Sequence, residues 1–138
     1  MADLVRVSFT IEKPLYRRLE QLQRNARYDN RSEFIRDLIR AKLVEEQWKE
    51  DEEAVGTISL VYNHEVRLLS RKLTSLQHRH HDAILATTHV HLDQHLCAEM
   101  IMVKGRPSTI EEMADRLGTQ KGVLHVAVSM SSTGRRLA

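Results

Sequence analysis

Residues 5–11 (VRVSFTI) alternate between apolar and polar side chains, and this short segment constrains the fold more than any other part of the chain. In a β-strand its apolar residues share one face and its polar residues the other. Residues 14–26 and 30–43 carry apolar side chains at helical spacing, so we expect no second strand in the first 44 residues. Because a lone strand leaves its backbone donors and acceptors unpaired, we expect residues 5–11 to pair with the same strand of a second chain.

Two such strands form a ribbon that fits the major groove of DNA and turns its polar face toward the base edges. The second helix is expected to open at Asn30, with Glu33 three residues later, as a variant of the capping box. Free backbone N–H groups at that helix start suit a phosphate. Residues 1–44 carry ten Lys and Arg against six Asp and Glu, an excess that fits an anionic partner but equally fits a solvated basic face.

The segment of residues 45–53 (EEQWKEDEE) carries six acidic residues and one basic residue, with Trp48 as its only apolar side chain. This composition is typical of a helix end that runs into a solvated linker. We therefore divide the chain into a DNA-binding domain at residues 1–47, an acidic linker at 48–53 and a second domain at 54–138.

The second domain alternates predicted strands and helices in the order βαββαβ, which is the ferredoxin-like split motif. The expected elements are strands at residues 54–62, 83–91, 97–104 and 123–130, a helix at 65–78, and a helix capped by Ser108 with Glu111 three residues later. The chain is thus expected to be an α+β protein. Helices cover only one face of such a sheet, so the other face favours contact with a second chain.

Histidine is concentrated in this domain: six of the eight histidines lie between positions 78 and 95, and the lone Cys97 follows. His89 and His91 are two residues apart on a strand, so both imidazoles leave the same face. Cys97 begins the neighbouring strand within reach of them, and His78 ends the preceding helix. Such a set of imidazoles and one thiolate suits a borderline transition metal, either tetrahedral zinc or a planar Ni(II) or Cu(II) site. The competing interpretation is surface histidines beside a buried, inert cysteine.

Other classes of protein fit the sequence less well. A metalloenzyme needs an open coordination position and a placed general base, and no HExxH-like pairing occurs. A repressor that ignores metals has no use for the His- and Cys-bearing second domain. One cysteine excludes an intramolecular disulfide framework, and the charged amino end does not resemble a signal peptide. No apolar run approaches the roughly 20 residues that span a membrane, so we expect no membrane partner and a cytoplasmic location.

The first segment resembles a ribbon-helix-helix DNA-binding domain of the Arc and MetJ type. The resemblance lies in the strand VRVSFTI, the helix sequence PLYRRLEQL and the opening NRSEFIRDLIR of the second helix. It implies two sets of DNA contacts. The residues that would read bases are Arg6, Ser8 and Thr10, and those that would lie near backbone phosphates are Asn30, Arg31 and Ser32.

Nearly all of residues 4–130 resemble the nickel-responsive transcriptional regulators (NikR). The motifs VYNHE, QHRHHD, THVHL, CAE and VKG carry this resemblance together with the ribbon-helix-helix motifs. It implies a homotetramer in which ribbon-helix-helix dimers flank a core of ACT-like domains. It also implies one Ni(II) per chain, bound in a square-planar site by His89, His91 and Cys97 of one chain and His78 of a neighbouring chain. Nickel at this tetramer interface would promote operator binding, usually for repression. A zinc- or copper-sensing regulator of the same architecture is the alternative.

The resemblance assigns further roles. Gln77, Tyr62, His64 and Glu99 match groups that orient the metal ligands, and Glu33 and Asp37 match a second cation site between domains, such as one for potassium. Arg67 matches a contact to the DNA backbone. Two positions depart from relatives: Val66 replaces a lysine beside Arg67, and Arg79 replaces a histidine that is not a ligand. The histidines interpreted mainly as surface or interface residues are His80, His81, His95 and His125, with weak extra metal binding an alternative for the first two.

Overall fold

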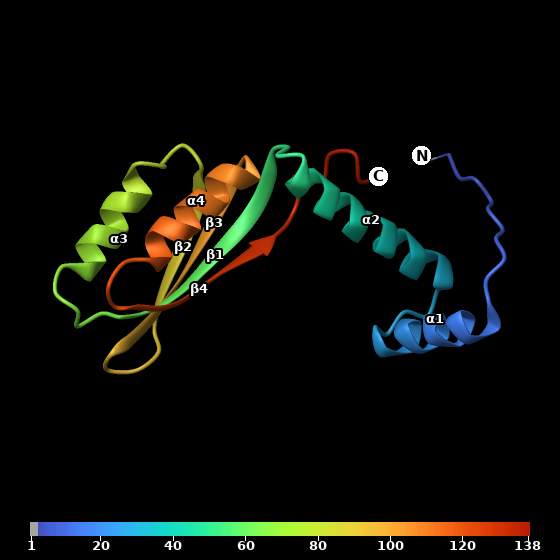
Figure 1. Cartoon of the computed structure of the whole chain (residues 1–138), viewed down its shortest axis with the longest axis horizontal. Coiled ribbons are helices and arrows are strands. Elements are labelled where there is room, and N and C mark those ends of the chain that lie inside the picture. Colours follow the sequence, from blue (N-terminus) through green and yellow to red (C-terminus); the bar gives the residue numbers. More distant parts are fainter. Residues whose placement is uncertain (1–2) are drawn as a thin grey trace. The chain divides into compact units, whose positions relative to one another are not determined.

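A computed structural model describes residues 3–138 and divides the chain into two compact units, one ending at Arg40 and the other beginning at Ala41 (Figure 1). The boundary falls within helix α2 (Arg31–Lys49), so the predicted acidic linker at residues 48–53 lies in the second unit. Residues 1 and 2, which the predicted first domain includes, lie outside the described residues.

The first unit contains α1 (Lys13–Asn25) and the first part of α2, as the apolar spacing predicts. Pro14 lies in the first turn of α1, where its missing N–H costs nothing. The side-chain oxygen of Asn30 caps α2 by accepting the backbone N–H groups of Ser32 at 2.8 Å and Glu33 at 3.3 Å. The Glu33 carboxylate pairs with Arg36 one turn further on, so the cap rests on Asn30.

Residues 3–12 form an extended segment that has no strand partner within the single chain. The apolar side chains of the predicted strand are consequently uncovered: Val5 is 83% exposed, Val7 74% and Phe9 63%. The strand expected at residues 5–11 is therefore not formed in the single chain. The reason is the one that the sequence suggests, because the backbone hydrogen bonds of a strand need a second strand beside it.

The second unit has the predicted βαββαβ order, which confirms the α+β fold class. Its elements are β1 (Ala54–Asn63), α3 (Leu69–His78), β2 (Ile84–His91), β3 (Leu96–Gly105), α4 (Pro107–Gly118) and β4 (Val123–Met130). The strands form one antiparallel sheet in the order β2-β3-β1-β4. This order places β2, which carries two of the predicted metal ligands, at an edge.

Helices α3 and α4 lie on the same face of this sheet (Figure 1), and the core is packed between them and the strands. Alternate residues of β1 are buried, as are alternate residues of β3. Buried side chains of the helices, including Leu69, Leu73 and Leu117, complete the core. The opposite face of the sheet keeps exposed apolar side chains, and none of the described helices is long and apolar enough to cross a membrane.

Helix α3 begins at Leu69, four residues later than the helix predicted at residues 65–78. The side-chain oxygen of Asn63 accepts the backbone N–H of Glu65 at 2.9 Å, and the Val66 N–H donates to the Asn63 carbonyl at 3.2 Å. Leu68, at the cap position, has a left-handed backbone conformation with φ of 64°. Local turn bonds therefore replace the first helical turn that the apolar pattern predicts.

The predicted cap of α4 is also wrong. Ser108 lies inside the helix, which begins at Pro107, and Arg106 occupies the cap position without a side-chain bond. Asp51 supplies the acceptor instead: its carboxylate accepts the Ser108 backbone N–H at 2.8 Å and the Ser108 hydroxyl at 2.9 Å. These bonds lower the pKa of Asp51 below its usual value. A residue of the acidic linker thus caps a helix 57 positions away in the sequence.

Trp48 ties the end of α2 to the rest of the second unit. Its side chain is buried in the core of that unit, and its indole N–H donates to the Ser131 carbonyl at 2.8 Å. The acidic residues that follow pair with cations of the same unit, Glu53 with Lys104 at 3.7 Å and Glu52 with Arg136 at 2.5 Å. The linker predicted to be solvated is therefore held by the second unit.

Candidate metal centre and nucleic-acid interface

The hairpin of β2 and β3 brings two predicted metal ligands together. His91 lies opposite Cys97 in the register of the two strands, and Nδ1 of His91 is 3.3 Å from Sγ of Cys97. Cys97 is fully buried while His91 is exposed at the sheet edge. Burial raises the pKa of the Cys97 thiol, with the charges of Asp93 and Glu99 acting in the same direction. The thiol therefore keeps its proton until a cation binds.

His64 completes a cluster with His91 and Cys97. One ligand atom from each of these three residues lies within 4.8 Å of the others. Metal–nitrogen and metal–sulfur bonds measure about 2.0–2.3 Å, so donors this close fit around a single ion. The resemblance assigns His64 only a role in orienting the ligands, and the residue lies in the turn after β1. His64 directly follows β1, and the end of β1 pairs with the start of β3, where Cys97 lies. Predicting that His64 lies near Cys97 would have required the register of these two strands.

His89 lies next to this cluster on the same strand face. Its ring centroid is 5.2 Å from that of His91, and its Nδ1 atom is 3.4 Å from the hydroxyl of Tyr62. Tyr62 is buried directly opposite Cys97 in the register of β1 and β3. Burial raises the pKa of Tyr62 to about 12, so its hydroxyl stays protonated and can donate to the His89 ring.

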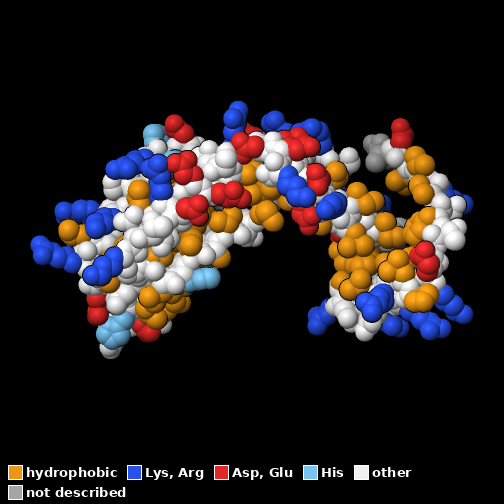
Figure 2. Space-filling model, in the orientation of Figure 1, with side chains coloured by type: hydrophobic (Ala, Val, Ile, Leu, Met, Phe, Trp, Pro, Cys, Tyr) orange, Lys and Arg blue, Asp and Glu red, His pale blue; other side chains and the backbone are white. Residues whose placement is uncertain are grey.

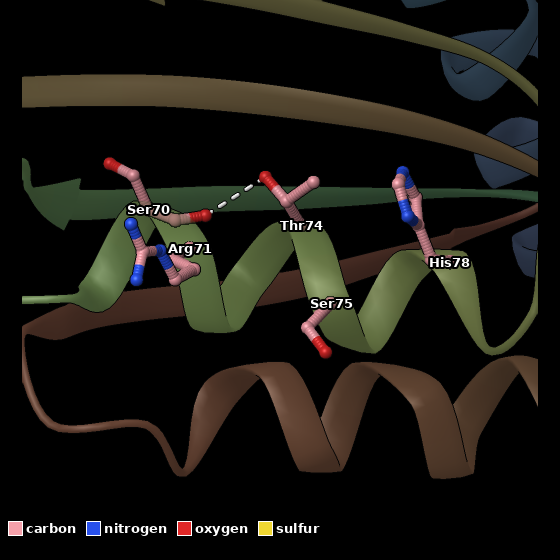
Figure 3. A pocket seen from close by; sticks show the side chains of 5 residues that line it. All are labelled: Ser70, Arg71, Thr74, Ser75 and His78. Carbon is pink, nitrogen blue, oxygen red and sulfur yellow. Dashed lines mark hydrogen bonds between the residues drawn. The ribbon is translucent and has the colours of Figure 1, made fainter.

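Helix α3 carries His78 and Gln77 at its end. The Gln77 amide donates to the buried carboxylate of Glu99 at 3.0 Å, which satisfies that carboxylate inside the fold. His78 lines a hollow of about 220 Å³ with Thr87 of β2, and a second hollow of about 480 Å³ along α3. Figure 3 shows His78 and Thr74 on one side of α3 and Ser75 on the other. Among the described residues, His78 is not part of the close ligand cluster.

The donor chemistry of this centre fits a borderline transition metal. One thiolate and two or three imidazoles are softer ligands than the carboxylates and carbonyls that Mg²⁺ and Ca²⁺ prefer. The nearest buried carboxylate, Glu99, is occupied by Gln77. The residues present therefore suit Ni(II), Cu(II) or Zn(II), and the donor set alone does not choose among them.

The first unit presents the predicted DNA contacts on its extended segment and at the start of α2. Arg6, Ser8 and Thr10 are exposed, as is Ser32. Arg31 is held within the unit: its side chain donates to the Tyr16 hydroxyl at 2.6 Å and to Gln23 at 3.1 Å. The N–H groups of Ser32 and Glu33 already donate to Asn30, so a phosphate at this helix start would compete with that cap.

The two carboxylates predicted for a second cation each have a cationic partner. Glu33 pairs with Arg36, and Asp37 pairs with Arg40 at 2.8 Å. The Tyr28 hydroxyl also donates to Asp37, and this bond is the main cause that lowers the pKa of the Asp37 carboxyl.

Arg67, the remaining predicted DNA contact, is exposed in the turn between β1 and α3. Figure 2 shows lysine and arginine side chains on the surface of both units.

The chain matches two described protein families. Residues 55–131 match the NikR C terminal nickel binding domain, and residues 5–46 match the ribbon-helix-helix protein family of the copG type. Proteins named as nickel-responsive regulators are similar over almost the full length. Those from Geotalea uraniireducens and Geobacter sulfurreducens are 47% and 46% identical, each over 99% of both chains.

This chain belongs to the nickel-responsive regulator family. A further relative of that name, from Caldanaerobacter subterraneus subsp. tengcongensis, is 44% identical over 99% of this chain and 90% of its own. The family consists of transcriptional regulators rather than enzymes. This confirms the prediction of a nickel-responsive transcriptional regulator and the prediction that the chain is not an enzyme. An uncharacterised protein from Thermotoga maritima has a similar structure, with a TM-score of 0.53 and 19% identity over 57% of this chain and 98% of its own. That likeness concerns the fold alone.

Proposed function

We propose that this chain is a nickel-responsive transcriptional regulator that binds operator DNA more tightly when Ni(II) occupies its second unit. The observation that carries the proposal is the cluster of Cys97 and histidines at an edge strand, in a chain that also matches a ribbon-helix-helix family. A sensor needs a metal site and a DNA-binding segment in one chain, and both features are present.

The proposed nickel ligands are His89, His91 and Cys97 of one chain and His78 of a neighbouring chain, with one Ni(II) per chain. The contact between His91 and Cys97 and the nearness of His89 support the first three. The exposed position of His78 at the end of α3 makes it available to another chain. Tyr62, Gln77 and Glu99 are proposed orienting groups through the hydrogen bonds described above, and His64 is a fourth because it lies close to His91 and Cys97.

DNA binding is assigned to the first unit of two paired chains. Residues 5–11 of each chain would form a ribbon that covers its apolar side chains against α1 and α2 and presents Arg6, Ser8 and Thr10 to base edges. The exposure of both sets of side chains in the single chain supports this arrangement. The proposed contacts to the DNA backbone are Asn30, Arg31, Ser32 and Arg67.

The proposed assembly is a homotetramer, built as a dimer of ribbon-helix-helix dimers. Support comes from the uncovered face of the sheet in the second unit, where Val90, Met100 and Met102 are between 40% and 45% exposed.

A second cation, such as potassium, is proposed at Glu33 and Asp37, where it would compete with the arginines that pair with them. Repression is the proposed sign of regulation.

Nickel acts in this proposal as an effector that binds one arrangement of the chains better than another. If the favoured arrangement also binds DNA better, each ligand raises the affinity for the other by the same factor. The measurable quantity is therefore the ratio of DNA affinities with and without Ni(II).

The test uses the full chain and a DNA duplex selected from a random-sequence pool with the nickel-loaded protein. We expect His89→Ala and Cys97→Ala to abolish the nickel-dependent gain in affinity for this duplex. His80→Ala, which removes a half-buried histidine outside the proposed ligand set, is the matched control and should keep the gain. Unchanged nickel-dependent binding in the first two variants would contradict the proposal.

Metal identity requires a parallel titration. The same duplex is titrated with protein loaded with Ni(II), Zn(II) or Cu(II), and we expect the largest gain in DNA affinity with Ni(II). A larger gain with Zn(II) or Cu(II) would show that this metal, rather than nickel, is the effector. The proposed coupling between metal binding and DNA binding would still hold.

A further inference from the structure

The tip of the β2–β3 hairpin, residues 92–95, is a rigid connection between the strands that carry His91 and Cys97. The Asp93 carboxylate accepts the backbone N–H groups of His95 at 2.7 Å and Leu96 at 2.8 Å. The Leu92 N–H donates to the Leu96 carbonyl at 2.9 Å. These bonds hold the tip in one conformation, so a shift of the strands is passed on to the tip.

This hairpin tip contacts the turn between β1 and α3 at three points. The His64 backbone N–H donates to the His95 carbonyl at 3.0 Å, and Nε2 of the His64 ring lies 2.5 Å from the Gln94 carbonyl. The side chains also meet, because Nδ1 of His95 is 2.9 Å from a carboxylate oxygen of Glu65. The hairpin that carries the candidate ligands is thus fastened to a second segment.

That second segment, residues 63–68, carries Arg67 and contains hydrogen bonds of its own. Asn63 accepts the N–H groups of Glu65 and Val66, and the Leu69 N–H donates to the Val66 carbonyl at 3.1 Å. Arg67 lies two residues beyond Glu65, inside these bonds. Arg67 is therefore close in sequence to the residue that contacts the hairpin tip.

We infer that His95 and Glu65 are positioning residues that couple the metal-bearing hairpin to Arg67. The inference rests on the proposed function, because it takes Arg67 as a contact to DNA and the hairpin as the metal site. His95 and Glu65 touch neither the metal nor the DNA in this scheme. Their contact reduces the freedom of the Arg67 turn, so that an ordered hairpin presents Arg67 in one place.

The expected effect is small, because both side chains are more than half exposed. Exposed side-chain contacts of this kind change an equilibrium by about two- to fivefold. We expect His95→Ala and Glu65→Gln each to weaken DNA binding of the nickel-loaded chain by this factor. The double variant should lose no more than His95→Ala alone, since both changes act on the same contact. Nickel affinity, measured by competition with a chelator, should stay within about twofold.

Glu112→Gln is the matched control. It removes an ion pair with Arg116 on α4, where Glu112 is 56% exposed against 54% for Glu65. The control should leave affinity for the selected duplex unchanged. A loss equal to that of Glu65→Gln would show that the loss does not depend on the contact with His95, and it would overturn the inference.

Two further measurements separate positioning from a general structural effect. In an Arg67→Ala background, His95→Ala should cause no additional loss of DNA affinity. In the metal-free chain, backbone amides of residues 64–68 should exchange hydrogen faster in His95→Ala than in the wild type or Glu112→Gln. Additive losses with Arg67→Ala, or unchanged exchange, would overturn the inference. DNA binding of the wild type that ignores nickel would overturn the proposed function instead, and the exchange experiment would still test the contact.

Discussion

At the scale of single residues, Tyr62 contacts His89, a proposed ligand of the candidate metal centre. Its ring is buried, it lies opposite Cys97, and its hydroxyl reaches the ring of His89. A pKa of about 12 keeps the phenol neutral, so it contributes a hydrogen bond rather than a charge. When the other ring nitrogen of His89 binds a cation, Nδ1 carries the proton and donates to the Tyr62 hydroxyl oxygen, which fixes the orientation of the ring.

We therefore predict that Tyr62→Phe weakens nickel binding without unfolding the chain. Groups that orient metal ligands contribute about 10- to 100-fold to affinity, and the 3.4 Å contact to His89 is long, so we expect about tenfold. Because the phenol does not ionise below its pKa of about 12, the loss should be the same at pH 6 and pH 9. Chelator competition measures the affinity. Equal affinities of variant and wild type would contradict this role.

At the scale of elements, the segment after α2 is organised by a contact with the start of α4. Asp51 accepts two hydrogen bonds from Ser108, one from its backbone N–H and one from its hydroxyl. The backbone bond is the main cause that lowers the pKa of Asp51 in the folded chain below its unfolded value. A lowered pKa means that the ionised carboxylate stabilises the folded chain. This contribution is present above the unfolded pKa and is lost as the pH falls through the folded one.

Asp51→Asn should accordingly lower the melting temperature at pH 7, and the difference from the wild type should shrink as the pH falls below about 4. Asparagine retains an acceptor oxygen and tolerates the left-handed backbone at this position, where φ is 58°, so the charge is the main change. Glu50→Gln, at the exposed neighbouring residue, is the control. A difference that stays constant from pH 7 to pH 3 would contradict the explanation.

At the scale of the whole molecule, each unit leaves a separate apolar surface open in the single chain. The first unit exposes the apolar residues of its extended segment, and the second exposes those on the uncovered face of its sheet. Two independent surfaces allow two kinds of contact between chains, which is what a dimer of dimers requires. On the sheet, Met100 and Met102 alternate along β3 with fully or nearly buried neighbours.

Met102→Lys should therefore disrupt the proposed tetramer while leaving pairing through the first unit intact. A charge within an apolar interface costs more than the interface gains at that position. Light scattering after size-exclusion chromatography should show a smaller species, whereas Thr119→Lys, at an exposed site after α4, should keep the assembly of the wild type. If Met102→Lys remains a tetramer, the uncovered face of the sheet is not the interface, and this prediction is wrong.

Local patterns in the sequence correctly predicted both helices of the first unit and the order of elements in the second, because each strand or helix is encoded by neighbouring residues. The resemblance of the sequence motifs correctly predicted the family. The two-residue spacing of His89 and His91, and the short turn before Cys97, likewise placed their side chains on one sheet face. The domain boundaries, the metal ligands and the DNA contacts stay predictions. The complete metal site and the DNA contacts depend on a bound metal, a second chain or bound DNA.

Only the tertiary structure decided which distant residues meet. His64 joins the metal cluster, Asp51 caps α4, Trp48 bonds to Ser131, and Glu65 meets His95. These contacts depend on sheet register and on turns whose side-chain bonds replace helical ones, and neither is visible in hydrophobic periodicity. The opening strand shows the opposite limit. Its sequence predicts a second strand beside it, and the single chain does not supply one. The proposed partner is the same strand of another copy.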